Sequence, residues 1–577
     1  MRVPLPLRRD YRRWTGCPAR GVLAAKTRED TMAETIRGAD ILVRALAQAG
    51  VRRVFSLSGN HIMPVYDALL GSGIGIIHTR HEAAAVHMAD AWARLTGEIG
   101  VALVTGGQGH TNAVAALPTA LAGEVPVLLL SGHAPLAELG LGAFQELEQA
   151  RMAAPLCKHA ATVSSAQALA GEVAAAIRIA RSGRPGPVHL SLPTDVLDAR
   201  VEAPALPGAE AFAPAAMPLS AESVAAIAAA IAAAERPVLI APPALCTPQG
   251  HAALAALSAR AGLSVLPMES PRGLGDPSLG AFAQVLAEAD LLVLLGKPLD
   301  FTLRFGRAPA IPAAARFVVV EPDEEVLARA ARGLGARLAV SAIAGATEAM
   351  AALAAEASPL LPHRNATWAQ RLAHAVAFRP AAWDALAGAP EGPIQPATLC
   401  HALRPFLAAQ PDTVLVSDGG EIGQWAQAML SAPARVINGV AGAIGPGIPF
   451  AMAARVARPA ARILAVMGDG TFGFHMAEFD TAHRHGLPFV AVVGNDARWN
   501  AEHQIQLREY GANRTHGCEL APGTRYDLAA AALGAHGEFV TRAEDLAPAL
   551  ERAFASGKPA CVNVVIEGQP APSVRLP

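Results

Sequence analysis

Two short segments in the last third of the chain combine acidic side chains with glycine. The first is Gly468-Asp469-Gly470, which follows the apolar run RILAVM. The second is Asn495-Asp496, which follows PFVAVVG, and its aspartate lies 27 positions after Asp469. Carboxylate oxygens are ligands that Mg²⁺ prefers, usually together with substrate phosphates. Glycines at the start of a helix also let backbone N–H groups approach a phosphate.

The two aspartates make chemical sense together. Asp469 alone would repel a phosphate, so a cation must lie between Asp469 and the phosphate. The carboxyl ends of neighbouring parallel strands meet at one edge of a sheet, where α/β proteins bind ligands. If the two apolar runs are such strands, Asp469 and Asp496 bind one Mg²⁺. A lone GDG would be an ordinary turn, and the second segment makes the prediction specific.

His81-Glu82 forms a third candidate, at the start of the helical pattern HEAAAVHMADAWARLTG. The simpler interpretation of Glu82 is an acid in the first turn that complements the helix dipole. A zinc site is excluded, because HExxH needs histidines four positions apart on one helix face. Here His81 and His87 are six positions apart.

The spacing of the first two segments resembles the GDG…NN motif of thiamine diphosphate enzymes, with Asp496 in place of the second Asn. The resemblance implies that Asp469 and Asp496 bind Mg²⁺ through their side chains. It also implies that the backbone carbonyl of Arg498 is a third protein ligand, and that Gly468 and Gly470 contact the cofactor. Aspartate keeps an oxygen ligand where the motif has Asn.

The segment IIHTRHEAAAVHMADAWARLTG resembles the pyrimidine-binding helix of the acetolactate synthase-like group, and the resemblance extends over about residues 36–566. It implies that Glu82 hydrogen-bonds N1′ of the aminopyrimidine and so promotes removal of the thiazolium C2 proton. Gln145 would face the active site. Ile444 would hold the cofactor in its bent form, with a plain core position as the alternative.

The member of the group is harder to identify. His61, in SGNHIMPVYDALL, matches an active-site histidine of benzaldehyde lyase-like enzymes, and its unperturbed pKa near 6.5 suits proton transfer. Capping of the next helix is the alternative. LLGKPLDFTLRFG (294–306) is similar to a segment of oxalyl-CoA decarboxylase and 2-hydroxyacyl-CoA lyase. GSGIG (71–75) lacks the GxGxxG spacing, so FAD stays open.

The resemblance therefore implies an enzyme that uses thiamine diphosphate and Mg²⁺ to form or cleave carbon–carbon bonds in small 2-oxo acids or 2-hydroxy carbonyl compounds. A 2-hydroxyacyl-CoA lyase or an oxalyl-CoA decarboxylase-like enzyme is one alternative. A non-catalytic regulatory relative is another, although such a relative would be expected to lose Glu82 or the metal pair. The resemblance also implies a homodimer or homotetramer, because the cofactor would bridge two chains.

Three α/β blocks must position these residues. Strand and helix patterns alternate over 34–200, 219–355 and 392–567, which predicts three doubly wound parallel-sheet domains. By the resemblance they are the pyrimidine-binding, central and diphosphate-binding domains. Pro-containing linkers are expected at 201–218 and 356–391, with a tail at 568–577.

Composition narrows the remaining classes. Of 577 residues, 52% are hydrophobic and 17% charged, with a net charge of −2, which disfavours disorder and a nucleic-acid partner. No apolar run reaches the ~20 residues of a membrane span. The six scattered cysteines suggest a reduced, cytoplasmic protein. Residues 1–31 are Arg-rich without an apolar core, and we interpret them as a disordered leader or a mis-assigned start.

Overall fold

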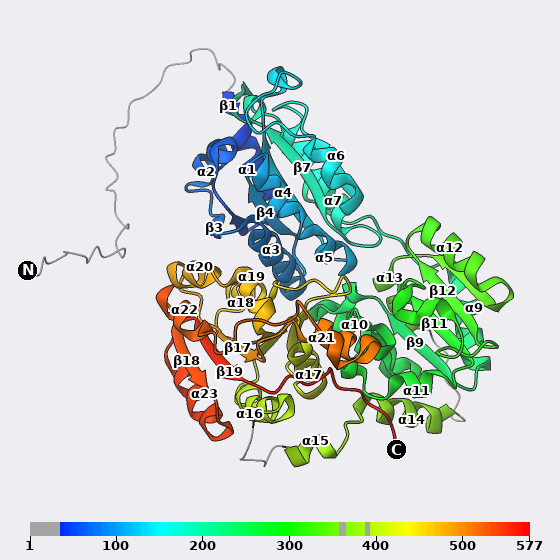
Figure 1. Ribbon diagram of the computed structural model, residues 1–577. Helices are drawn as coiled ribbons and strands as arrows, with labels where there is room; N and C mark the ends of the chain where they lie inside the picture. The colour runs from blue at the N-terminus through cyan, green and yellow to red at the C-terminus, as the bar shows by residue number, and fades with distance from the viewer. Residues whose placement is uncertain (1–34, 357–364, 387–392) are drawn as a thin grey trace, which may run out of the picture.

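The computed structural model describes residues 35–356, 365–386 and 393–577. The predicted leader, 1–31, lies outside the described residues. The described chain forms three parallel sheets, each flanked by helices, together with a small antiparallel pair (Figure 1). The α/β class with three parallel sheets is therefore confirmed.

The N-terminal sheet has six parallel strands in the order β3-β2-β4-β5-β7-β6. The strands are β2 (Arg53–Ser56), β3 (Gly75–His78), β4 (Gly100–Val104), β5 (Val127–His133), β6 (His159–Thr162) and β7 (Val188–Pro193). Its helices are α1 (Gly38–Gln48), α2 (Met63–Leu69), α3 (Glu82–Thr96), α4 (Gln108–Val114), α5 (Leu117–Ala122), α6 (Gln149–Ala153), α7 (Leu169–Arg181) and α8 (Thr194–Asp198). The antiparallel pair joins β1 (Thr35–Arg37) to β8 (Arg200–Glu202).

The central sheet has five parallel strands in the order β10-β9-β11-β12-β13. They are β9 (Pro237–Ala241), β10 (Val265–Pro267), β11 (Leu291–Leu295), β12 (Arg316–Glu321) and β13 (Leu338–Ile343). The helices are α9 (Ala221–Ala233), α10 (Pro248–Ala261), α11 (Phe282–Leu286), α12 (Glu324–Leu334) and α13 (Ala346–Ala355). In the described part of 356–391, α14 (Ala366–Ala377) adds Trp368 and Leu372 to the core of this sheet, and α15 spans Ala382–Ala385.

The C-terminal sheet has six parallel strands in the order β15-β14-β16-β17-β19-β18. They are β14 (Thr413–Ser417), β15 (Ala434–Ile437), β16 (Arg462–Gly468), β17 (Val490–Asn495), β18 (His536–Val540) and β19 (Ala560–Val565). The helices are α16 (Pro396–Ala408), α17 (Glu421–Met429), α18 (Gly447–Ala457), α19 (Asp469–His475), α20 (Glu478–Arg484), α21 (Asn500–Tyr510), α22 (Tyr526–Ala532) and α23 (Leu546–Ala555).

Helix α3 joins the N-terminal and C-terminal sheets. All its residues except the last are buried, and many are alanine, which lets it pack closely against α18. Residues of both helices, such as Val86 and Phe450, share one hydrophobic core. Figure 1 shows α3 lying over α18 and α19. Because Glu82 begins α3, this packing holds the start of that helix close to the C-terminal half.

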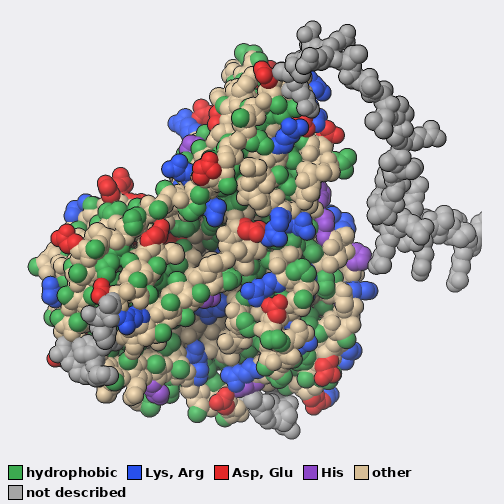
Figure 2. All heavy atoms as spheres, turned by 180° about the vertical axis from the view of Figure 1, so that it is seen from behind, with side chains coloured by type: hydrophobic (Ala, Val, Ile, Leu, Met, Phe, Trp, Pro, Cys, Tyr) green, Lys and Arg blue, Asp and Glu red, His purple; other side chains and the backbone are tan. Residues whose placement is uncertain are grey.

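The surface agrees with the composition. Figure 2 shows Lys and Arg side chains interspersed with Asp and Glu over the visible face. Within the described residues, no helix is both long enough and apolar enough to cross a membrane.

Candidate active site

Asp469 and Asp496 lie at the ends of two neighbouring strands. β16 and β17 pair in parallel, with Gly468 opposite Gly494. Asp469 directly follows β16 and is only 2% exposed, whereas Asp496 directly follows β17 and is half-buried. The strand adjacency expected from the two apolar runs is therefore what the structure has.

Both carboxylates have raised pKa values, so their charges are only partly compensated. Burial raises the pKa of Asp469 to about 6. Burial, together with the negative charge of Asp469, raises the pKa of Asp496 to about 7. Asp469 Oδ2 is buried and has no hydrogen-bond partner among the described residues. A divalent cation between the two side chains would offset their repulsion and give Asp469 Oδ2 a partner. These residues therefore fit Mg²⁺.

Glycines place backbone without side chains beside the two carboxylates. A Cβ on Gly470 would lie 2.7 Å from the ring of Trp499, and one on Gly420 would lie 3.1 Å from the Cα of Gly468. Gly420 also has φ +84°, which disfavours other residues. The cavity here is lined by residues from four chain segments: Gly420, Glu421, Ile422, Ile444, Gly468, Asp469, Gly470, Thr471, Gly494, Asp496, Arg498, Trp499, Asn500, Ala501 and Glu502. It includes all six residues predicted in the C-terminal domain.

The loop after β17 is held by Asn495. Its Nδ2 donates to the Thr524 carbonyl at 3.2 Å and to Asn563 Oδ1 at 3.1 Å, while its Oδ1 accepts from the N–H of Ala497 at 3.2 Å. Ala497 has φ +55°, and Arg498 then pairs with the backbone of Glu519. These bonds set the direction of the Arg498 backbone beside the carboxylates.

Asp418 organises the turn that carries Ile444. Its carboxylate accepts from the N–H groups of Gly419 at 2.6 Å, Gly445 at 3.3 Å and Gly447 at 2.6 Å. Ile444 lies so close to Gly419 that a Cβ there would be 2.4 Å from its Cγ2. Ile444 is 38% exposed, so it is not a plain core residue in the described chain. Burial raises the pKa of Asp418 to about 7.

Glu82 begins α3 with a buried carboxyl group that is 8% exposed. Its Oε2 accepts from Asn112 Nδ2 of α4 at 3.1 Å. A Cβ on Gly109 would lie 3.3 Å from its Oε1. The start of the helix is capped by His81, whose Nδ1 accepts from the N–H of Ala83 at 3.1 Å. The Glu82 carboxylate therefore faces α4 and does not cap its own helix.

His61 and Gln145 gather around the same glycine-rich loop, Gly106-Gly107-Gln108-Gly109. Nδ1 of His61 lies 3.2 Å from Thr105 Oγ1, and its ring stacks on Phe144 with centroids 5.9 Å apart. Burial lowers the pKa of His61. Gln145 has φ +56° and packs so closely on Gly107 that a Cβ there would be 2.6 Å from its own Cβ.

Known protein families match both the N-terminal and the C-terminal part of the chain. Residues 36–152 match the family described as thiamine pyrophosphate enzyme, N-terminal TPP binding domain. Residues 418–564 match the corresponding C-terminal TPP binding domain. "Acetolactate synthase large subunit IlvG" of Mycobacterium tuberculosis is 33% identical over 556 residues, covering 94% of this chain and 98% of the relative. The chain belongs to the thiamine pyrophosphate enzyme family.

Relatives of a second kind are nearly as similar. "2-hydroxyacyl-CoA lyase 2" of Bos taurus is 32% identical over 593 residues, and covers 92% of this chain and 90% of the relative. The human protein of that name is 30% identical over 581 residues, with the same coverage. The chain is thus a thiamine pyrophosphate-dependent enzyme of the carboligase and lyase kind.

In this thiamine pyrophosphate enzyme the predicted residues form two groups. Ile444, Gly468, Asp469, Gly470, Asp496 and Arg498 line one cavity at the C-terminal sheet. Glu82, His61 and Gln145 surround the glycine-rich loop of the N-terminal sheet and do not line that cavity. Among the described residues, no three or more His, Cys, Asp or Glu side chains form a metal-binding group. The Mg²⁺ prediction therefore needs backbone and diphosphate oxygens as well.

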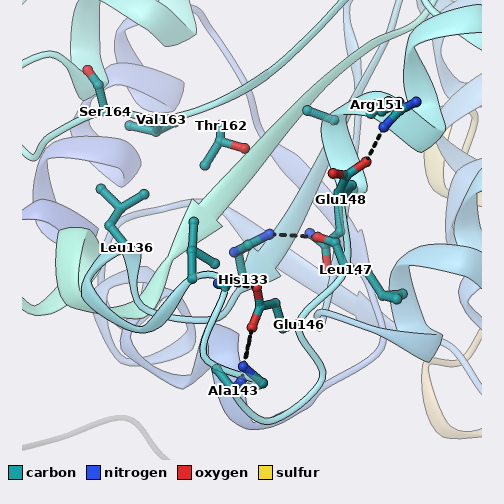
Figure 3. A pocket seen from close by; sticks show the side chains of 15 residues that line it. His133, Leu136, Ala143, Glu146, Leu147, Glu148, Arg151, Thr162, Val163 and Ser164 are labelled. Atoms are coloured by element: carbon teal, nitrogen blue, oxygen red, sulfur yellow. Dashed lines mark hydrogen bonds and ion pairs between the residues drawn. The ribbon is translucent and has the colours of Figure 1, made fainter.

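A second, larger cavity lies beside the segment that carries Gln145. Figure 3 shows His133 in its wall, with Nε2 3.0 Å from the Leu147 carbonyl. Glu146 ties the loop together, because its carboxylate accepts from the N–H groups of Gly142 and Ala143 at 3.1 and 3.0 Å. The cavity has a volume of about 1250 Å³ and a largely apolar lining that includes Leu136, Leu139, Leu147 and Val163.

Three residues with a part in this geometry were not predicted. Asp418 had a usable signal. It follows the apolar run TVLVS and precedes Gly-Gly, much as Asp469 follows an apolar run and lies between two glycines. Asn112 and Gln149 had none. Gln149 is buried, and its Oε1 accepts from the N–H of Gly107 at 2.9 Å, while its Nε2 donates to the Gly132 carbonyl at 3.0 Å. It anchors the glycine-rich loop to the end of β5.

Proposed function

We propose that this thiamine pyrophosphate enzyme binds its cofactor with Mg²⁺ at Asp469 and Asp496, and that the backbone carbonyl of Arg498 completes the protein ligands. One observation carries the proposal. The buried Asp469 Oδ2 has no hydrogen-bond partner among the described residues, and it belongs to a carboxylate whose charge raises the pKa of Asp496. Two like charges at one sheet edge favour a bound cation.

The surrounding backbone suits a diphosphate. Gly468 and Gly470 have no side chains, so phosphate oxygens can approach the main chain closely. The bound cofactor supplies a nucleophilic carbon and an electron sink for making or breaking a carbon–carbon bond. Ile444, exposed at the cavity wall and held by the Asp418 turn, would support the cofactor from one side.

The N-terminal group would handle protons and the substrate. Glu82 would hold the proton at N1′ of the pyrimidine. Because the pKa of His61 is lowered, its imidazole is neutral near pH 7 and can accept a proton from a substrate hydroxyl. Nδ1 of His61 contacts Thr105, and a hydrogen bond between the ring and the Phe144 backbone partly offsets the lowering of its pKa. Gln145, beside the cavity of about 1250 Å³, would hydrogen-bond the substrate.

The reaction class is the forming or cleaving of carbon–carbon bonds in 2-oxo acids or 2-hydroxy carbonyl compounds. A second, narrower candidate is cleavage of a 2-hydroxyacyl thioester. One observation favours it: the apolar cavity of about 1250 Å³ beside Gln145 is far larger than pyruvate needs. It would accept the hydrocarbon part of a larger substrate, as the name of one group of relatives suggests.

We further propose a homodimer or homotetramer. The C-terminal group of predicted site residues lines one cavity of the chain, and none of the N-terminal group, Glu82, His61 and Gln145, lines it. A second copy would bring the N-terminal group of one chain to the C-terminal group of another. Binding of FAD in the central domain stays open, and we propose no role for it.

The test is a product screen with purified full-length protein, thiamine diphosphate and Mg²⁺. Pyruvate, benzoin and a 2-hydroxyacyl-CoA would be offered separately, with and without FAD. We expect aldehyde release from the larger substrates and loss of turnover in Glu82→Gln and Asp469→Ala, with the exposed-site variant Asp198→Asn as control. Acetolactate from pyruvate alone would reject the second candidate. Unchanged turnover in both site variants would reject the site.

A further inference from the structure

Asn112 makes the one side-chain hydrogen bond to Glu82 among the described residues. Its Nδ2 lies 3.1 Å from Glu82 Oε2. Asn112 belongs to α4, whereas Glu82 begins α3, so the bond crosses between two helices that pack together. It is a bond from a neutral amide to a carboxyl group that is 8% exposed.

The two oxygens of Glu82 are therefore not equivalent. Oε2 is engaged by Asn112, while Oε1 has no hydrogen-bond partner within the part of the chain that the structure describes. Oε1 faces the Cα of Gly109, where even a Cβ would lie only 3.3 Å away. The glycine thus leaves space beside the oxygen that Asn112 leaves free.

We propose that Asn112 is a positioning residue for Glu82: it holds Oε2 and so presents Oε1 to N1′ of the bound pyrimidine. The inference rests on the proposed role of Glu82 in cofactor binding. The terminal torsion of a glutamate is broad, so without a partner its carboxylate samples many orientations. A hydrogen bond to one oxygen of an ionised carboxylate is charge-assisted and selects one of them.

A purely structural role for Asn112 is poorly supported. Its side chain is exposed in the described chain, and exposed polar side chains usually contribute little to stability. The neighbouring Thr111 closes the turn of α4, with Oγ1 donating to the Gln108 carbonyl at 2.9 Å. Thr111 is therefore a matched control: its loss disturbs the same helix and leaves the contact to Glu82 intact.

The experiment measures cofactor affinity by calorimetry in the presence of Mg²⁺, with two probes. One probe is thiamine diphosphate, and the other is an analogue in which N1′ is replaced by C–H. We expect Asn112→Leu and Asn112→Asp to bind thiamine diphosphate about tenfold more weakly, as for one lost charge-assisted bond. Both variants should bind the analogue as tightly as the unmodified protein does. Thr111→Val should change neither affinity.

Two results would overturn the inference. Equal weakening for both probes would mean that Asn112 only shapes the pocket, and unchanged affinity for thiamine diphosphate would mean that it does not position Glu82. Glu82→Gln separates this from failure of the proposed function. If Glu82→Gln removes the preference for thiamine diphosphate over the analogue while the Asn112 variants keep it, only the inference about Asn112 fails. If Glu82→Gln also keeps the preference for thiamine diphosphate over the analogue, the proposed role of Glu82 fails.

Discussion

The C-terminal and central sheets place their first and third strands side by side in the same way, yet the edges of the two sheets differ in charge. Both orders have the second strand on one side of the first and the third on the other, the arrangement that opens a ligand crevice at the carboxyl edge. At the C-terminal edge, the charge of Arg498 lowers the pKa of Asp496 but is outweighed by burial and by the charge of Asp469, and Asp469 Oδ2 has no hydrogen-bond partner within the described residues.

At the central edge the protein balances its own charges. Arg184, from the N-terminal domain, pairs with Glu124 and donates to Glu321 Oε2 at 2.7 Å and to the Gly296 carbonyl at 3.1 Å. Lys297 is 1% exposed, and its Nζ lies 2.9 Å from Asp300.

The comparison shows why topology alone does not locate a site. At the central edge a cross-domain ion-pair cluster balances its own charges, whereas the C-terminal edge keeps one buried and one half-buried carboxylate that an added cation would complete. We therefore expect substitutions at the central edge to change stability, and substitutions at the C-terminal edge to change cofactor affinity.

The largest expected effect is on stability at the central edge. Arg184→Met would leave Glu124 and Glu321 buried without their partner, which should cost about 5 kcal/mol, the upper end for a broken buried pair because two carboxylates are affected. Denaturant unfolding of the cofactor-free protein would measure it, with Arg329→Met on exposed α12 as control. A loss of thiamine diphosphate affinity without a loss of stability would reverse the assignment of the two edges.

The next effect concerns Asp418, a residue of the C-terminal domain whose side-chain carboxylate accepts hydrogen bonds from backbone N–H groups. Its pKa is raised to about 7 in the folded protein, so the folded state binds its proton more tightly than the unfolded state. Stability is then fully present below about pH 4 and is lost as the pH rises through about 7, by about 4 kcal/mol for a shift of about 3 pKa units.

Asp418→Asn should remove this slope. Unfolding of the metal-free protein, measured between pH 4 and 8, should show a flatter dependence for Asp418→Asn than for the unmodified chain. Asp198→Asn, at an exposed position, should follow the unmodified chain. Parallel curves for all three proteins would show that Asp418 does not titrate in this range.

A smaller change is expected for metal and cofactor binding at the C-terminal edge. Asp469→Ala removes one of two carboxylates, and we expect thiamine diphosphate with Mg²⁺ to bind about 100-fold more weakly, or about 2.7 kcal/mol. Calorimetry would measure this, and chelation of Mg²⁺ from the unmodified protein should weaken binding as well. Glu321→Gln at the central edge serves as the comparison, and an equal loss there would break the contrast between the sheets.

The smallest effect is expected for Asp496→Asn. This change removes the repulsion with Asp469 and should stabilise the metal-free protein by about 1 kcal/mol, the scale of two like charges a few ångströms apart in a solvated site. The amide oxygen can still bind Mg²⁺, so turnover should persist. Thermal unfolding without metal would detect the gain, and a destabilised variant would show that the two charges do not repel each other.

The sequence was sufficient for much of the C-terminal site. Asp469 and Asp496 could be paired because each follows an apolar run at a strand end, and parallel strands bring such ends to one edge. The glycines on both sides of Asp469 marked a close backbone approach. The alternating strand and helix patterns likewise predicted three parallel sheets, which the structure has.

Other features depended on tertiary structure. Nothing near Asn112 in the chain indicates that its amide reaches Glu82, 30 positions earlier, because only the packing of α4 on α3 brings them together. Gln149 reaches Gly107 for the same reason, since α6 packs against α4, which Gly107 precedes. Local spacing encodes which residues end a strand or begin a helix, whereas side-chain partners far apart in sequence are set by how those elements pack. The sequence by itself thus determined the sheets and the acidic pair, and the fold decided which groups orient them and at which sheet edge the protein balances its own charges.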